Sequence, residues 1–173
     1  AHLAAEEAKR YGEVNIVASS RDDVYTYIPD WKKGTFTPDA DYVHMTSNNT
    51  IYGTRYVELP EVNAPLVTDA SSMILSEVMD VNKFGVIYAG AQKNLAPAGL
   101  TIAIIKEELA GNELPFTPSV MSYKNMIEKD SMYNTPSTWP IYMLGLMCDW
   151  VESVGGVAAV EQMNIKKAWT RIR

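Results

Sequence analysis

Two short runs of almost entirely apolar residues, at 85–89 and 100–105, constrain the fold of this chain more than any other feature. Each run has the length of a β-strand, and neither alternates between polar and apolar residues, as a strand does when one face meets water. Strands of this kind belong to sheets that are covered on both faces, and such sheets are mostly parallel. The other predicted elements are strands at 14–18, 42–45 and 66–68 and helices at 1–11, 138–154 and 157–173. The pattern predicts an α/β fold in which helices cover a mostly parallel sheet.

The composition is typical of an ordered globular domain and argues against several function classes. With 173 residues, of which 47% are hydrophobic, the chain can bury one substantial core. A formal net charge of −6 offers no basic patch for nucleic acid or an anionic membrane surface, and no apolar run is long enough to cross a bilayer. One cysteine and two histidines give no disulfide framework and no zinc signature. We therefore expect a cytoplasmic protein that binds no metal, nucleic acid or membrane, with Cys148 buried in an apolar helix.

Lys93 lies in the turn between the two apolar runs, among small residues that include Gly90, Ala91 and Gly99. A lysine held there is expected to be partly desolvated, which lowers the pKa of its ammonium and leaves a neutral amine able to attack a carbonyl. Pyridoxal phosphate is the usual aldehyde for such a lysine. The local pattern leaves a second interpretation open, in which Lys93 is an ordinary surface lysine with a solvated charge.

Four segments carry a resemblance to one enzyme family. The longest is GVIYAGAQKN at 85–94, continued by PAGLT at 97–101, and it closely resembles the cofactor-lysine segment of the phosphoserine aminotransferases. The segments HMTSNNT at 44–50, TDASSMILS at 68–76 and MYNTPST at 132–138 resemble further family motifs and follow in the family's order. The resemblance extends over essentially the whole chain. It implies the large cofactor-binding domain of an aspartate aminotransferase-like fold, within the class V aminotransferases.

The resemblance implies roles for four residues around pyridoxal 5′-phosphate. Lys93 would bind the cofactor aldehyde covalently and then move the proton of the substrate α-carbon. Asp69 would pair with the pyridine nitrogen and keep it protonated. Thr50 would donate to the phenolic oxygen, and Gln92 would hydrogen-bond the phosphate. Two of them also have a local interpretation: Asp69 could be a helix N-cap, which its own pattern favours, and Thr50 could cap the turn that ends at Gly53.

The resemblance also implies a homodimer. Asn134 and Thr135 match family residues that reach across the dimer interface to the cofactor phosphate of the partner subunit, so that two chains build each site. Locally these residues are typical of a loop before a helix, with Ser137 or Thr138 as the N-cap. His44 is expected to pack or to hydrogen-bond near the end of its strand, and it is assigned no catalytic role.

The activity implied by the resemblance transfers an amino group between L-glutamate and 3-phosphohydroxypyruvate, which yields O-phospho-L-serine and 2-oxoglutarate in serine biosynthesis. The sequence leaves open whether the phosphohydroxythreonine step of vitamin B6 biosynthesis is served as well. Because family members are longer, residues 1–173 are expected to form a single partial domain, the central part of the large domain. Without an N-terminal segment and a C-terminal small domain, this part is expected to be inactive alone. Two alternatives stay open: a dimerising fragment without catalytic function, and another class V aminotransferase or a desulfurase.

Overall fold

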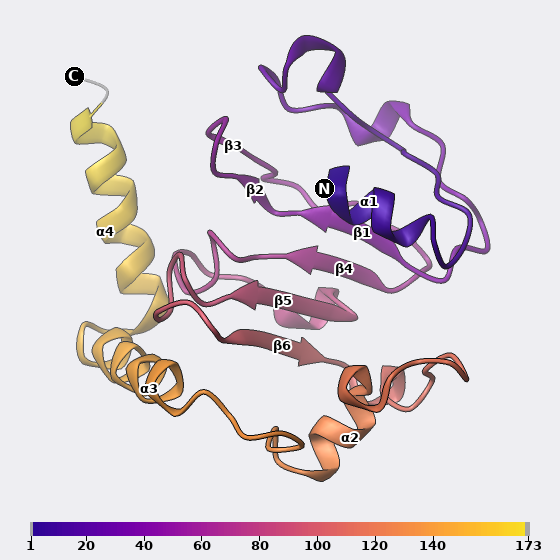
Figure 1. Cartoon of the computed structure of the whole chain (residues 1–173). Helices are drawn as coiled ribbons and strands as arrows, with labels where there is room; N and C mark the ends of the chain where they lie inside the picture. Colours follow the sequence, from indigo (N-terminus) through magenta and orange to yellow (C-terminus); the bar gives the residue numbers. More distant parts are fainter. Residues whose placement is uncertain (1, 172–173) are drawn as a thin grey trace.

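The computed structural model describes residues 2–171, with side chains up to residue 169. Its centre is a four-stranded sheet in the order β1-β4-β5-β6 (Figure 1). The strands are β1 (Val43–Thr46), β4 (Leu66–Asp69), β5 (Val86–Gly90) and β6 (Thr101–Ile105). Strands β1, β4 and β5 run parallel, whereas β6 is antiparallel to β5. All four lie within one residue of their predicted bounds, and the prediction of a mostly parallel sheet is confirmed.

The register of the strands gives the sheet two different faces. Met45 and Ile87 lie on one face, where they pack with Leu66, Ala70 and Phe84 in the main core cluster. The opposite face is only half buried over β1, β4 and β5. It carries the side chains of His44, Thr46, Asp69 and Tyr88. Because side chains alternate across a strand, these four polar or titratable side chains lie on the face opposite the main core, whereas Thr68, in register with Met45 and Ile87, is buried on the core face.

Four α-helices accompany the sheet within the described residues. They are α1 (His2–Ala8), α2 (Tyr123–Glu128), α3 (Thr138–Ser153) and α4 (Gly156–Arg171). Helices α3 and α4 lie beside the carboxyl ends of the parallel strands, at the left of Figure 1. Leu144 of α3 packs against a second core cluster, formed by Ala89, Ala91 and Leu95. This contact holds the start of the loop after β5 against the helical layer.

The break between α3 and α4 consists of Val154 and Gly155. Gly155 and the first residue of α4, Gly156, have φ angles of 104° and 81°. Glycine adopts this left-handed region without the steric cost that a Cβ atom brings. The predicted helices at 1–11, 138–154 and 157–173 are confirmed in outline, with residues 1, 172 and 173 outside the described part. Among the described helices, none by itself has the length and apolar character of a bilayer span, although α3 and α4 together pass that test as a pair bent by 82°.

A short antiparallel hairpin, β2 (Asn48–Asn49) and β3 (Thr54–Arg55), follows β1 directly. Its turn ends at Gly53, with a φ of 66°, and holds Thr50 just beyond the end of β1.

Short 3-10 helices occupy several of the connections. They are η1 (Arg21–Asp23), η2 (Trp31–Lys33), η3 (Val81–Lys83), η4 (Glu107–Leu109) and η5 (Ser119–Met121).

The prediction of a strand at 14–18 is wrong. Residues 13–20 have no regular secondary structure, and the side chain of Ile16 is 55% exposed. Side-chain bonds hold the segment in place: Asn15 Nδ2 donates to the carbonyl oxygen of Thr35 at 2.8 Å and to Thr37 Oγ1 at 3.3 Å. Apolar composition does not make a strand where no neighbouring backbone pairs with its N–H and C=O groups.

Two apolar elements are more exposed than predicted. Strand β6 forms an edge of the sheet, and its Thr101, Ala103 and Ile104 are exposed, so the prediction of a sheet covered on both faces is wrong there. Cys148 is also exposed, because α3 turns only part of its surface toward the sheet. In both cases the described residues pack against one side of an element that is apolar on more than one side.

Candidate active site

Four of the predicted site residues come together at one edge of the sheet. Thr50 lies in the turn of the β2–β3 hairpin that follows β1, Asp69 is the last residue of β4, and Gln92 and Lys93 follow β5. Because β1, β4 and β5 are parallel, their carboxyl ends meet at this edge (Figure 1). In open α/β sheets, ligands bind outside the carboxyl ends of the strands. The topology therefore gathers residues that are up to 43 positions apart in the sequence.

The amine of Lys93 is bonded to the first of these loops. Lys93 Nζ donates to Thr50 Oγ1 at 3.1 Å, and Thr50 Oγ1 also shares a hydrogen bond with Ser72 Oγ. Lys93 is exposed, so the predicted desolvation of its ammonium is not met in the described chain. Lys93 is exposed because its loop lies beyond the end of the sheet, where the described residues cover the loop on one side only.

Asp69 is held by the residue two positions later. Its Oδ1 accepts from the backbone N–H of Ser71 at 3.0 Å and from Ser71 Oγ at 2.6 Å. The helix N-cap interpretation of Asp69 is wrong, because residues 71–76 form successive turns and Leu75 has a left-handed φ of 61°. Asp69 instead caps a turn, which is the other common use of an aspartate at the end of a strand.

His44 and Tyr88 form a pair on the same face of the sheet as Asp69. His44 Nε2 and the Tyr88 hydroxyl lie 2.9 Å apart, and the two rings stack with centroids at 5.9 Å. Burial raises the pKa of Tyr88 to about 12, and the charge of Asp69 adds to this. Burial lowers the pKa of His44, against a smaller opposing effect of Asp69. Both rings are therefore uncharged at neutral pH, and His44 hydrogen-bonds within its sheet as predicted.

The position of the Gln92 side chain requires a glycine two residues before it. A Cβ atom on Gly90 would lie 2.7 Å from Gln92 Oε1 and 2.9 Å from Gln92 Nε2. The exposed amide of Gln92 therefore folds back over the end of β5, into space that only a glycine at position 90 leaves free.

Asn134 and Thr135 stand apart from the other four site residues. Both are exposed in the loop between α2 and α3, and neither forms a hydrogen bond with the other four in the described chain. Ser137 takes the N-cap position of α3, as one of the two predicted candidates, but without a side-chain capping bond. The structure thus leaves these two side chains available to a group outside the described residues.

Two features of the site were not predicted. Ser71 and Ser72 lie in the turn after β4 and bond Asp69 and Thr50, respectively. The His44–Tyr88 pair joins residues 44 positions apart in the sequence. The available signal was the run Asp-Ala-Ser-Ser at 69–72, which supplies hydroxyl groups next to a carboxylate but gives no partner for them.

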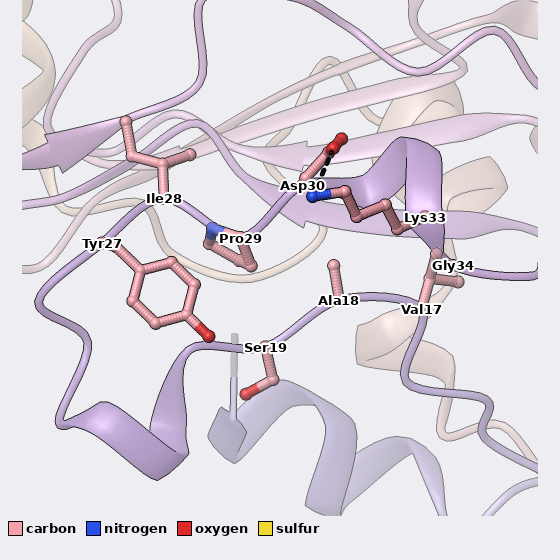
Figure 2. A pocket seen from close by; sticks show the side chains of 9 residues that line it. All are labelled: Val17, Ala18, Ser19, Tyr27, Ile28, Pro29, Asp30, Lys33 and Gly34. Carbon is pink, nitrogen blue, oxygen red and sulfur yellow. Dashed lines mark ion pairs between the residues drawn. The ribbon is translucent and has the colours of Figure 1, made fainter.

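A hollow of about 450 Å³ lies elsewhere, near the N-terminal end of the described chain, and contains none of the predicted site residues (Figure 2). Residues 17–19, 27–30, 33 and 34 line it, with Lys33 Nζ 3.6 Å from Asp30 Oδ2. Burial, followed by the charge of Asp22, raises the pKa of Tyr27 at its rim. We place the site at the sheet edge instead, because the amine, the carboxylate and the hydroxyl groups converge there. Among the described residues, no group of three or more His, Cys, Asp and Glu side chains could hold a metal ion.

The profile of the aminotransferase class-V family matches residues 1–171. The chain belongs to the class-V aminotransferases. It is 51% identical over 164 residues to a phosphoserine aminotransferase of Herminiimonas arsenicoxydans, which covers 94% of this chain and 45% of the relative. A phosphoserine aminotransferase of Flavobacterium johnsoniae is 51% identical over 169 residues, covering 97% of this chain and 47% of the relative. The predicted resemblance to phosphoserine aminotransferases is confirmed, and this class-V chain spans about half the length of the curated relatives it matches.

Solved structures support the same fold. The phosphoserine aminotransferase of Bacillus circulans subsp. alkalophilus superposes with a TM-score of 0.91 at 39% identity, over 96% of this chain and 46% of that one. A phosphoserine aminotransferase from Trichomonas vaginalis, described with bound PLP, superposes with a TM-score of 0.90 at 35% identity, over 96% of this chain and 48% of that one. The predicted aspartate aminotransferase-like α/β fold is thereby confirmed for this class-V aminotransferase chain.

Proposed function

We propose that the protein is a pyridoxal-phosphate-dependent phosphoserine aminotransferase, which moves an amino group between L-glutamate and 3-phosphohydroxypyruvate. The observation that carries the proposal is the convergence of Lys93, Thr50 and Asp69 at the carboxyl edge of the sheet. Relatives with this name match nearly the whole chain at about half identity, which supports the choice of substrates. A cytoplasmic location and a place in serine biosynthesis belong to the same proposal, as does action on the phosphorylated hydroxythreonine precursor of vitamin B6.

The residues at the edge fit the cofactor chemically. Lys93 is exposed and forms no ion pair with a carboxylate among the described residues, so its nitrogen is accessible to an aldehyde. Asp69 Oδ2 has no hydrogen-bond partner in the described chain, whereas Oδ1 has two donors. When bound, the cofactor supplies an aldehyde and a pyridinium ring that accepts electrons from the substrate. Lys93, Asp69, Thr50 and Gln92 would hold it.

Each of these side chains has a distinct task in this proposal. The nitrogen of Lys93 would hold the cofactor through its aldehyde, and the free amine would take the proton from the substrate α-carbon. The carboxylate of Asp69 would keep the ring nitrogen protonated, since an adjacent anion favours the charged form. The hydroxyl of Thr50 accepts from Lys93, and it can donate its own proton to the phenolic oxygen when Ser72 is the donor in the bond that the two hydroxyls share.

We propose that a second copy of the chain completes the site, with Asn134 and Thr135 directed to the cofactor phosphate of the partner. Both side chains are exposed and precede α3 directly. Helix α3 carries a stripe of exposed apolar side chains at helical spacing, defined by Trp139, Tyr142, Leu146 and Trp150, with exposures of 62%, 59%, 43% and 46%. Large exposed apolar patches mark interaction surfaces, and the position of the stripe next to Asn134 and Thr135 favours a homodimer.

We further propose that residues 1–173 form a partial domain, the central part of the large cofactor-binding domain, which does not turn over substrate by itself. The exposure of Lys93 favours this, because transamination requires a site from which water is largely excluded. The proposed aminotransferase activity and the proposed inactivity are compatible, since the activity is proposed for the complete protein and the inactivity for residues 1–173 alone.

Covalent trapping tests the function. The complete protein is mixed with pyridoxal phosphate and reduced with borohydride, and the modified peptide is identified by mass spectrometry. We expect the modification on Lys93 and its loss in Lys93→Ala, whereas Lys83→Ala, which removes an exposed lysine of η3, should leave it unchanged. Modification that persists in Lys93→Ala at the level of the unsubstituted protein would refute the assignment.

A further inference from the structure

The hydroxyl of Ser71 connects the two strand ends that carry the proposed cofactor residues. Ser71 Oγ donates to Asp69 Oδ1 at 2.6 Å and accepts from the backbone N–H of Gly90 at 3.0 Å. The direction of both bonds is determined, because a backbone N–H can only donate and an ionised carboxylate can only accept. The result is one chain of bonds from Gly90 through Ser71 to Asp69.

A second bond ties the same two segments together. Asn94 Nδ2, one residue after Lys93, donates to the carbonyl oxygen of Ile74 at 2.6 Å. The turn at 70–76 is thus bonded to the end of β5 through Ser71 and to the loop after β5 through Asn94. The amine of Lys93 and the carboxylate of Asp69 are therefore held in one bonded unit.

We propose that Ser71 is a positioning residue, which orients the carboxylate of Asp69 toward the ring nitrogen of the cofactor. This inference rests on the proposed function. Both donors of Ser71 bond Oδ1, which leaves Oδ2 as the oxygen free to accept from a pyridinium N–H. A carboxylate that is already held loses no rotational freedom when the ring arrives, so its bond to the ring nitrogen is stronger than that of a freely rotating one.

The test compares two ligands that differ only at the ring nitrogen. The complete protein, free of cofactor, is titrated with pyridoxal phosphate and with its 1-deaza analogue, in which a C–H replaces the ring nitrogen. The dissociation constant of the deaza analogue, divided by that of pyridoxal phosphate, measures the contact between the ring nitrogen and Asp69 alone. In Ser71→Ala we expect this ratio to fall by about tenfold, the size of one hydrogen bond to a charged group. A general loss of folding would weaken both ligands and leave the ratio unchanged.

Three further variants make the result specific. Ser71→Thr keeps the hydroxyl and should restore the ratio. Ser76→Ala removes a hydroxyl of the same turn that bonds only the carbonyl oxygen of Met73, at 2.5 Å, and should not change it. If Ser71→Ala fails to fold, Ser71→Cys preserves the volume with a weak donor and should lower the ratio in the same direction.

The outcomes separate this inference from the proposed function. A ratio in Ser71→Ala equal to that of the unsubstituted protein, or no recovery in Ser71→Thr, overturns the role of Ser71 while the function stands. If the unsubstituted protein binds both ligands equally, Asp69 does not contact the ring nitrogen, and the roles proposed for Asp69 and for Ser71 are both refuted. Failure of the function itself would show in borohydride trapping, as the absence of a modified Lys93.

Discussion

Replacing Gly90 with alanine should displace the side chain of Gln92 and weaken binding of the cofactor phosphate. The new Cβ atom would lie 2.7 Å from Gln92 Oε1 and 2.9 Å from Gln92 Nε2, inside van der Waals contact. Both atoms are at the far end of a flexible, exposed side chain, which can rotate away. The perturbation therefore acts on the position of one amide group more than on the fold.

The size of the effect follows from these contacts. Gly90 does not have a positive φ, so alanine suits the backbone there and stability should change by less than about 1 kcal/mol. The loss of one amide hydrogen bond to a charged phosphate costs about 1.5 kcal/mol or more. That free energy corresponds to roughly a tenfold weaker dissociation constant for pyridoxal phosphate.

The assay compares pyridoxal phosphate with pyridoxal, which lacks the phosphate, by fluorescence titration of the complete protein. Gly90→Ala should weaken binding of the phosphorylated ligand only. Gly85→Ala is the control, since its Cβ would meet the Cβ atom of Pro65 at 2.8 Å and Leu109 Cδ1 at 2.9 Å, and a proline ring cannot rotate away. It should lower the free energy of unfolding by about 1–3 kcal/mol without a selective effect on phosphate. Equal weakening of both ligands in Gly90→Ala would refute the role given to Gln92.

Two further predictions concern pH and assembly. Because burial, and then Asp69, raises the pKa of Tyr88 from 10.0 to about 12, its stabilising contribution is complete below pH 10 and is lost as the pH rises from 10 to about 12. Tyr88→Phe should therefore flatten the fall in unfolding free energy over that range, and an unchanged fall would contradict the cause given. Trp150→Glu places a charge in the exposed stripe of α3 and should shift the protein from dimer to monomer in sedimentation velocity. Glu152→Gln on the same helix should not, and a dimer that survives Trp150→Glu would count against the stripe as the interface.

Much of the fold could be predicted because its signals are local. The strands β1, β4, β5 and β6 are short apolar runs, and the turn that carries Lys93 is defined by the two runs on either side of it. The segment at 14–18 has the same local signal and forms no strand, because a strand also needs a partner. Local patterns therefore identify candidate strands, whereas pairing selects among them.

The candidate site could be predicted only as separate residues. Lys93, Asp69, Thr50 and Gln92 were identified by motif, and the parallel order of β1, β4 and β5 brings them to one edge. Motifs could not reveal that Ser71 links Asp69 to Gly90, since the partner lies 19 residues away on another strand.

The amino-acid sequence by itself determined the candidate strands and helices, the family, and the residues available for chemistry. Only the tertiary structure decided the antiparallel edge strand β6, the exposure of Lys93 and the bonds that hold the carboxylate of Asp69. The physical reason is the distance along the chain over which each effect acts. Backbone preferences and hydrophobic periodicity act over a few neighbouring residues, whereas burial and hydrogen-bond partners depend on segments that become neighbours only when the chain has folded.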